Sequence, residues 1–274
     1  MKPSDGLITE KLSLSPLWLM LKGYQWPFLA ILTILVFWEI TAILTRVNEI
    51  LLPRPSKVFI VMVTQRAILL KHMWITLYEI LVGFVLAVGV GIGMAIGIAH
   101  SDILKKMLYP LLVASQNIPK VAIGPLFVIW MGMGIASKAL LVFLICFFPI
   151  VVNTATGLVD VPQEMIDLLR SLNASKAQIL WKIRLPNAFP YIISGMKISI
   201  TLAVVGAIVG EFIAANQGLG FLILLTTGSF NTPMMMAAIG VLVLVGMILF
   251  EMISMLPAIF TPWRKIPEGQ PPLA

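Results

Sequence analysis

The longest polar insertion in the chain reads DVPQEMIDLLRSLNASKAQILWKIRLP and covers residues 160–186. It lies between two apolar stretches, 139–158 and 191–214, each about as long as a helix that crosses a bilayer. The pattern predicts two membrane helices joined by a long polar loop. The rest of the chain can be assigned outward from this loop.

The composition of the whole chain is that of a membrane protein. Of the 274 residues, 59% are apolar and 11% are charged, and the mean hydropathy is +1.02. A soluble domain has roughly 45–50% apolar and about 25% charged residues, so this chain cannot cover its surface with polar groups. We expect an all-α, polytopic fold with six transmembrane helices. The six stretches are Pro27–Leu44, Met73–Ala99, Leu108–Met131, Ala139–Leu158, Tyr191–Ala214 and Met234–Phe260.

The basic residues favour one orientation in the membrane. With the N-terminus inside, the inner segments hold eleven Lys and Arg and the outer segments hold six, as the positive-inside rule requires. The predicted layout is a cytoplasmic N-terminal segment at 1–26, a transmembrane domain at 27–260 and a cytoplasmic tail at 261–274. The loop at 159–186 then lies inside, and the uncharged segment 215–233 lies outside as a compact or re-entrant element.

The first half of the polar loop has the pattern of a short amphipathic helix. Asp160 and Gln163 are spaced as a near capping box, and Pro162 stands in the first turn, where its missing N–H costs little. An apolar stripe at i, i+3, i+4 and i+7 follows: Met165, Leu168, Leu169 and Leu172. Such a stripe must be covered by the lipid interface, by the bundle itself or by a docked cytoplasmic partner.

The second half of the loop predicts a sharp joint and another helix. Asn173 tolerates the left-handed conformation in which many helices end. Ser175 and Gln178 form a second capping box. The helix that they open is expected to stop before Pro186, because proline breaks the helical hydrogen-bond ladder.

Polar groups at membrane depth mark a candidate functional region. Three prolines interrupt the third apolar stretch, and Asn117 and Lys120 lie at its central break. Non-helical backbone at this depth persists only inside protein or beside a wet cavity. Glu211 in the fifth stretch would also be costly facing lipid. These residues either border a polar path or form a buried pair within one subunit.

Other features of the spans are expected to be structural. Glu39, Glu79 and Glu251 are expected in structural pairs or at the level of the headgroups. In the second stretch, two rows of small residues at spacing four are expected to pack within the bundle. These rows are Gly89, Gly93 and Gly97, and Gly91, Ala95 and Ala99.

Several classes of site are excluded by residue counts. Cys146 is the single cysteine, so an internal disulfide framework and a multi-Cys metal site are excluded. No Gly-Lys dipeptide occurs, so the chain has no P-loop. We expect no cofactor, no metal and no catalytic residue, and any nucleotide must be bound by another chain.

The polar loop resembles the cytoplasmic loop motif of permease subunits in binding-protein-dependent ABC importers. That motif reads Glu-Ala-Ala, three residues, Gly, and then Leu-Pro at a set distance. Asp167-Leu168-Leu169 stands at the Glu-Ala-Ala position, Asn173 at the Gly position and Leu185-Pro186 at the Leu-Pro position. The spacing of the motif is kept. The residue types differ at the Glu-Ala-Ala part and at the Gly, whereas the Leu-Pro is identical.

The resemblance extends over most of the chain and places it near the nitrate/sulfonate/taurine-type permeases. It rests on Leu52–Ser56, Thr76–Glu79 with Gly83-Phe84, Ile118-Pro119 with Trp130-Met131-Gly132, and Gly210-Glu211-Phe212 with Gly218-Leu219-Gly220. Leu111–Gln116 and Cys146–Asn153 look most like permeases for thiamine-pyrimidine precursors or riboflavin.

The resemblance implies the type I ABC importer permease fold in a bacterial inner membrane. The implied partners are a second permease copy, two ATP-binding subunits, a solute-binding protein and the lipid bilayer, but no nucleic acid. The chain is then no enzyme itself, and it carries a small solute by alternating access. Asn117, Lys120 and Glu211 would border the translocation path. The residues that would couple to the ATPase are Glu164, Asp167, Leu168, Leu169, Arg170, Leu172, Asn173 and Ser175.

Two functions of other classes remain as alternatives. A secondary transporter would typically show inverted repeats with midplane ion sites, and the two halves of this sequence show no such repeat. A membrane-embedded enzyme would need a nucleophile with its base, or a metal set, at bilayer depth. The sequence offers little for such a nucleophile or metal set, since it has only two histidines, His72 and His100, and a single cysteine.

Overall fold

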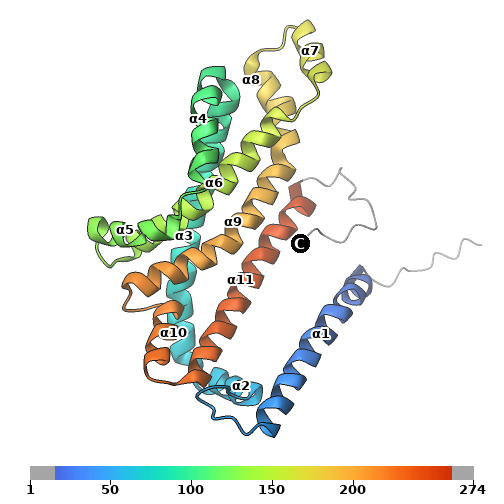
Figure 1. The fold of residues 1–274 in the computed structure, drawn as a ribbon. Helices are drawn as coiled ribbons and strands as arrows, with labels where there is room; N and C mark the ends of the chain where they lie inside the picture. Colours follow the sequence, from blue (N-terminus) through green and yellow to red (C-terminus); the bar gives the residue numbers. More distant parts are fainter. Residues whose placement is uncertain (1–15, 261–274) are drawn as a thin grey trace, which may run out of the picture.

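The computed structural model describes residues 16–260, and these residues form helices joined by short loops (Figure 1). The predicted C-terminal tail and the first fifteen residues of the predicted N-terminal segment lie outside the described part. The elements are α1 (Pro16–Leu44), α2 (Pro55–Thr64), α3 (Arg66–His100), α4 (Asp102–Ser115), η1 (Lys120–Ile123), α5 (Gly124–Met131), α6 (Ile135–Val159), α7 (Gln163–Ser171), α8 (Lys176–Ile179), η2 (Leu180–Arg184), α9 (Leu185–Ala214), α10 (Leu219–Gly228) and α11 (Thr232–Phe260).

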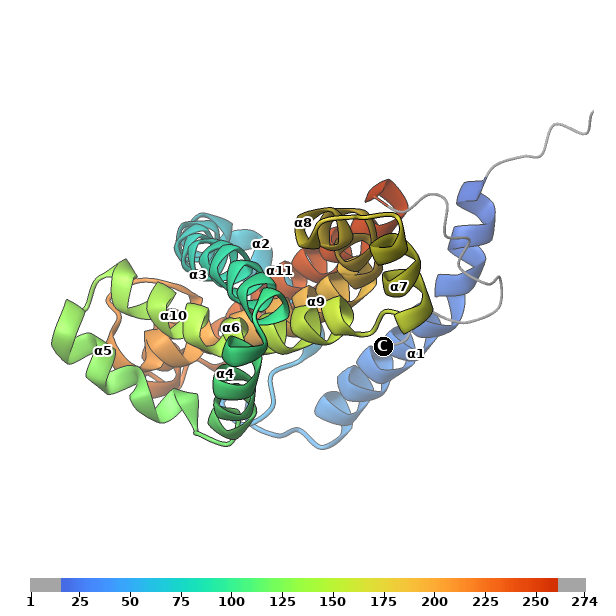
Figure 2. The same ribbon diagram turned by 90° about the horizontal axis from the view of Figure 1, so that it is seen from above.

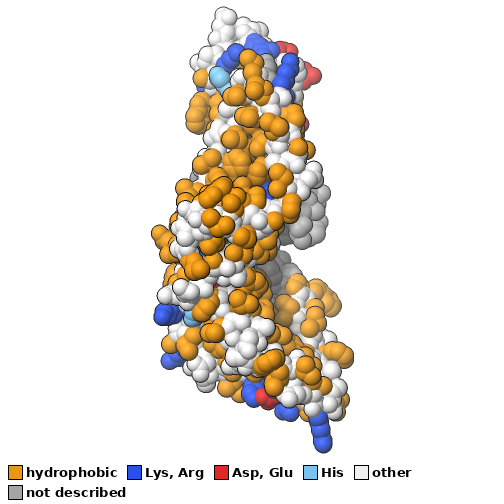
Figure 3. Space-filling model, turned by 60° about the vertical axis from the view of Figure 1, so that its left-hand side comes forward, with side chains coloured by type: hydrophobic (Ala, Val, Ile, Leu, Met, Phe, Trp, Pro, Cys, Tyr) orange, Lys and Arg blue, Asp and Glu red, His pale blue; other side chains and the backbone are white. Residues whose placement is uncertain are grey.

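The number of membrane spans agrees with the prediction of a polytopic helical fold. Five helices are long and apolar enough to cross a bilayer, in α1, α3, α6, α8–α9 and α11. A sixth span exists if the segments Ile103–Ser115 and Lys120–Met131, bent by 89° at their junction, count as one. Figure 3 shows Lys and Arg side chains near the two ends of the molecule and hydrophobic side chains over the surface between them, as a bilayer requires.

Helix α6 forms the centre of the bundle, with α3 and α9 packed against it (Figures 1 and 2). The close approach of α3 to α6 depends on glycines, which have no side chain. A Cβ on Gly83 would lie 2.6 Å from the Ala139 carbonyl oxygen, and one on Gly91 would lie 2.9 Å from Ile150 Cγ2. Ile150 is fully buried. Small residues on α3 therefore let α6 lie against it.

Only one of the two rows of small residues packs inside this chain. Gly91 and Ala95 are buried against α6, as expected. Gly89 and Gly93 instead have open space where a Cβ would be. The expectation of packing within the bundle was wrong for this second row, because spacing alone does not say which face of α3 meets a neighbour.

Helix α1 stands apart from the other spans, and α2 is its main contact (Figure 1). The Glu39 carboxylate accepts hydrogen bonds from the Ser56 N–H at 3.0 Å and the Ser56 hydroxyl at 2.8 Å. The N–H groups in the first turn of a helix have no acceptor within that helix, and the Glu39 carboxylate supplies one for the Ser56 N–H of α2. The structural role expected for Glu39 is therefore confirmed.

Candidate coupling and translocation sites

Helix α7 projects from one end of the bundle beyond the last turn of α6 (Figure 1). The predicted cap by Asp160 was wrong. The Asp160 N–H donates to the Thr156 carbonyl at 2.9 Å, which makes it part of the end of α6. Its carboxylate accepts from the Tyr191 hydroxyl. Helix α7 begins only after Pro162, and no side chain caps it.

The joint between α7 and α8 has the predicted left-handed residue. Asn173 has φ +57°, its N–H donates to the Arg170 carbonyl at 2.9 Å, and the Ala174 N–H donates to the Leu169 carbonyl at 2.9 Å. These two bonds are those of a Schellman motif. They direct the chain sharply into α8.

The second capping box is also confirmed, but the helix that it opens does not stop at Pro186. The Gln178 N–H donates to the Ser175 hydroxyl at 3.2 Å, and the Gln178 side chain accepts from the Ser175 N–H at 2.7 Å. Helix α8 then continues through the π-helix η2 into α9. Pro186 stands in the first turn of α9, where the wider π-type turns before it accommodate a residue without an N–H.

The predicted apolar stripe of α7 is largely exposed. Leu168 is 62% exposed and Leu172 is 70% exposed, while Leu169 is half-buried. The side chain that α7 turns toward the bundle is that of Ile166, which is 5% exposed. The bundle therefore does not cover the stripe, which leaves a lipid interface or a docked partner as its cover.

The polar coupling candidates lie around this stripe at the surface. Asp167 accepts hydrogen bonds from Arg170 at 3.3 Å and from Gln163 at 3.0 Å. Glu164 and Ser175 are exposed as well. An exposed ion pair contributes roughly 0.2–1 kcal/mol, whereas burial of a leucine contributes about 1.5–3 kcal/mol. If a partner covers this surface, the two exposed leucines would therefore contribute more to its binding than these charges.

Two of the candidate path residues, Asn117 and Lys120, lie at the bend between α4 and η1. Asn117 is exposed in this bend, and Lys120 is half-buried. The Lys120 ammonium donates to the Gln116 carbonyl at 3.3 Å and lies 4.8 Å from the centroid of the Phe148 ring of α6. The bend thus presents an amide and a cation at the depth where the third span is interrupted.

Glu211 lies in a different environment, fully enclosed by α3, α9 and α10. It is 1% exposed, and its carboxylate accepts from the Thr76 hydroxyl at 2.6 Å and from the Gly220 N–H at 2.5 Å. The Phe221 N–H, at 3.3 Å, is a further donor. Glu211 therefore caps the N-terminus of α10, where the partial positive charge of the helix stabilises a carboxylate.

The turn before α10 can contain only glycine at residue 218. Gly218 has φ +112°, and a Cβ there would lie 2.2 Å from the Glu211 carboxyl carbon. Both the left-handed backbone and the close approach exclude a side chain. This cap was not predicted from the sequence, although the Gly-Leu-Gly pattern that begins seven residues after the Glu211 carboxylate was a usable signal.

A buried ion pair lies beside this cap. The Lys138 ammonium donates to a Glu79 carboxylate oxygen at 2.9 Å, and their side chains are 5% and 0% exposed. Glu79 was expected to be structural, and this pair confirms it. In the described residues, no hydrogen bond or ion pair joins Glu211 to Asn117 or Lys120, so the three candidates do not form one cluster in this structure.

Replacement of Asn173 tests the geometry of the joint. The change Asn173→Val is expected to cost about 1–2 kcal/mol, because a β-branched residue resists the left-handed region, and to misdirect α7. Asn173→Gly is the matched control and should behave like the wild type. The measurement is the amount of the ATP-binding subunit implied by the resemblance that copurifies with each variant. Equal amounts with both variants would show that the joint does not position α7.

Comparison with known proteins places the chain among transport proteins. It is 36% identical over 87% of its length to the formylaminopyrimidine transport permease protein ThiX of Halalkalibacterium halodurans, covering 96% of that protein. It is 34% identical over 89% of its length to the riboflavin transport system permease protein RibX of Chloroflexus aurantiacus, covering 93% of it. The taurine permease TauC of Escherichia coli is 30% identical over 94% of this chain and 98% of that one.

A solved structure has the same fold. A chain of the MetNI methionine ABC transporter, in an inward-facing conformation, superposes with a TM-score of 0.63 at 18% identity, over 72% of this chain and 97% of that one. The described helices thus have the predicted type I importer permease fold. The family model of binding-protein-dependent transport system inner membrane components matches residues 87–257. The chain is a multi-pass membrane protein that belongs to this permease family.

Proposed function

We propose that this chain is the permease subunit of an ATP-driven importer in a bacterial inner membrane. Two copies would form the pore, with two ATP-binding subunits on the cytoplasmic side and a solute-binding protein outside. The observation that carries this proposal is a pair of exposed leucines at the end of the bundle, Leu168 in α7 and Leu172 directly after it. ATP hydrolysis would then reside in the partner subunits.

The bend between α4 and η1 supports a translocation path by alternating access. An exposed Asn117 and a half-buried Lys120 at an interrupted span are costly unless they meet water or a polar solute. Differential contacts with the partners would bias the equilibrium between inward-open and outward-open states. Glu211 borders this path only in a state in which α10 has moved away from it, since α10 covers it here.

The proposed solute is a heterocyclic vitamin or its pyrimidine precursor. This proposal is supported by the higher identity to the formylaminopyrimidine and riboflavin permeases than to the taurine permease. The test is ATPase activity of the reconstituted complex with its binding protein, with each of formylaminopyrimidine, riboflavin and taurine added. Stimulation by taurine alone would refute the solute class, and a complex without any ATP-binding subunit would refute the importer.

Cysteine labelling tests the predicted sides of the membrane. Exposed Ala177 in α8 and exposed Ser229 after α10 are each replaced by Cys in a Cys146→Ala background. Ala177 is preferred to Ser175, whose hydroxyl caps α8. A membrane-impermeant maleimide added to intact cells should label position 229 at least tenfold faster than position 177. Labelling of both from the same side would contradict the proposed layout.

Removal of the cation at the bend tests the path. Lys120→Ala is expected to lower solute transport about tenfold or more, because a hydrogen bond to a charged group contributes about 1.5–3 kcal/mol. Lys106→Ala, which removes an exposed cation from α4, is the matched control. Transport into vesicles is measured at equal permease content. Wild-type transport by both Lys120→Ala and Asn117→Ala would exclude these two residues from the path.

A further inference from the structure

A basic pocket lies between α7 and the ends of α3 and α6, on the side of α7 that faces the bundle. Its volume is about 310 Å³. Ile166, the buried residue of α7, lines it together with Arg170 one turn later. The exposed leucines that we assign to ATPase docking are not among its lining residues, so the pocket is distinct from the coupling surface.

The charged side chains that line this pocket are all basic. Its basic lining residues come from five different elements: His100, Lys105, Arg170, Lys176 and Arg184. Among the described residues that line it there is no Asp or Glu. Arg170 has an ion pair with Asp167 at 3.3 Å, whereas the other Lys and Arg have none with any described acidic side chain. Four cations around one pocket favour the binding of an anion in it.

Arg184 provides a second, independent indication of a ligand. Its Nη1 donates to the Ala99 carbonyl at 2.9 Å, which holds the guanidinium at the end of α3. Its Nε is buried and has no hydrogen-bond partner. A buried donor without an acceptor is destabilising, and an anion bound beside the guanidinium would supply that acceptor.

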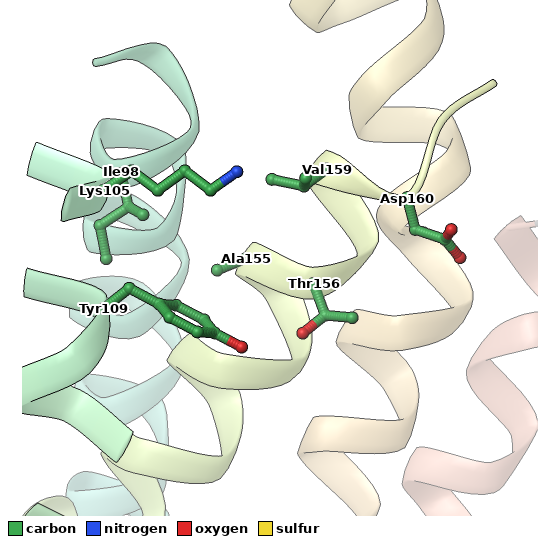
Figure 4. A pocket seen from close by; sticks show the side chains of 7 residues that line it. All are labelled: Ile98, Lys105, Tyr109, Ala155, Thr156, Val159 and Asp160. Atoms are coloured by element: carbon green, nitrogen blue, oxygen red, sulfur yellow. The ribbon is translucent and has the colours of Figure 1, made fainter. Parts of the chain in front are cut away.

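A mainly apolar cavity of about 560 Å³ adjoins the basic pocket between α4 and α6 (Figure 4), although polar residues such as Tyr109 and Thr156 also line it. Lys105 and Val159 line both cavities. Figure 4 shows the side chains of Lys105 and Tyr109 extending from α4 toward α6, whereas the Asp160 carboxylate is directed away from them. That carboxylate is already bound by the Tyr191 hydroxyl. The combined site has a cationic part and an apolar part, which suits an amphiphilic anion.

The depth of the site is that of the membrane interface, because two of the spans that border it end there, at His100 and at Val159. We propose that the basic pocket binds the phosphate of an anionic phospholipid such as phosphatidylglycerol, with an acyl chain in the apolar cavity. Basic pockets between membrane helices on the cytoplasmic side bind such headgroups. Free inorganic phosphate shares this chemistry but has nothing to place in the apolar cavity.

The test compares a double variant of the pocket with a double variant outside it. Lys105→Gln/Lys176→Gln removes two cations that line the pocket. Lys106→Gln/Lys182→Gln removes two equally exposed cations, in α4 and η2, that do not line it. The complete purified complex is titrated in detergent with short-chain phosphatidylglycerol, short-chain phosphatidylcholine and inorganic phosphate, and Tm is recorded. Each cation near a lipid surface contributes about 1 kcal/mol, so the pocket variant should bind phosphatidylglycerol roughly 30-fold more weakly.

The outcomes separate a lipid from a soluble anion. Stabilisation by phosphatidylglycerol but not by phosphatidylcholine or phosphate, lost in the pocket variant and kept in the control variant, supports the lipid site. Equal stabilisation by inorganic phosphate, lost in the same variant, supports an anion pocket but refutes the lipid as its occupant. Equal loss in both variants, or no effect of any anion, overturns the proposal without affecting the assignment as a permease.

Discussion

Replacement of Leu168 and Leu172 together by Asp is expected to weaken binding of the ATP-binding subunits by at least 100-fold. Both leucines are exposed in this structure, at 62% and 70%. Burial of a leucine contributes about 1.5–3 kcal/mol, so loss of two such contacts removes about 3 kcal/mol or more, which is a factor of over 100. The measurement is the ratio of ATP-binding subunit to permease after purification, together with solute-stimulated ATPase activity.

The control for this experiment is Leu168→Met/Leu172→Met, which keeps the apolar volume and should retain the partner. Leu169 is avoided because it is half-buried, and a charge there would disturb α7 itself. If the Asp variant retains both the partner and the stimulation, the stripe faces lipid and α7 is not the coupling element.

The change Lys138→Met is expected to have the largest effect on stability. It leaves Glu79 without its cation next to a second buried carboxyl group, that of Glu211. Loss of one partner from a buried ion pair costs about 3–5 kcal/mol, which corresponds to a fall in Tm of roughly 10 °C. Thermal unfolding of the purified protein in one detergent measures it.

A double-mutant cycle shows whether charge is the cause. In Glu79→Gln/Lys138→Met both charges are gone, and much of the stability should return, since a buried pair replaced by neutral groups is often close to neutral in free energy. The Glu211 cap keeps its three donors in this variant. A double variant no more stable than Lys138→Met would mean that packing around the lysine stem, rather than its charge, stabilises the bundle.

The positions of the spans could be predicted from the sequence because a helix in lipid must be long and apolar. The joint at Asn173 could be predicted for a similar reason, since few residues tolerate its φ of +57°. Both features follow from local physical chemistry. They do not depend on which neighbour the segment meets.

Features that depend on distant neighbours were missed or assigned wrongly. Asp160 was expected to begin a helix, but Tyr191, 31 residues later, binds its carboxylate. Glu211 was recognised as costly, yet the Thr76 hydroxyl that binds it lies 135 residues away. Pro186 was expected to stop a helix, because a π-helical turn that accommodates proline has no clear sequence signature. Such pairings require the packed bundle.

One continuous run of helix extends from Lys176 to Ala214, with π-type turns at η2, so a tilt of this run moves both of its ends. Its 39 residues span about 58 Å at 1.5 Å per residue. A tilt of about 10° around its midpoint would displace each end by about 5 Å in opposite directions. One end lies at the joint with α7 and the other at the Glu211 cap of α10. In the proposed layout, a displacement of the cytoplasmic end by the ATP-binding subunits would therefore move the opposite end as well, with α9 tilting against α6.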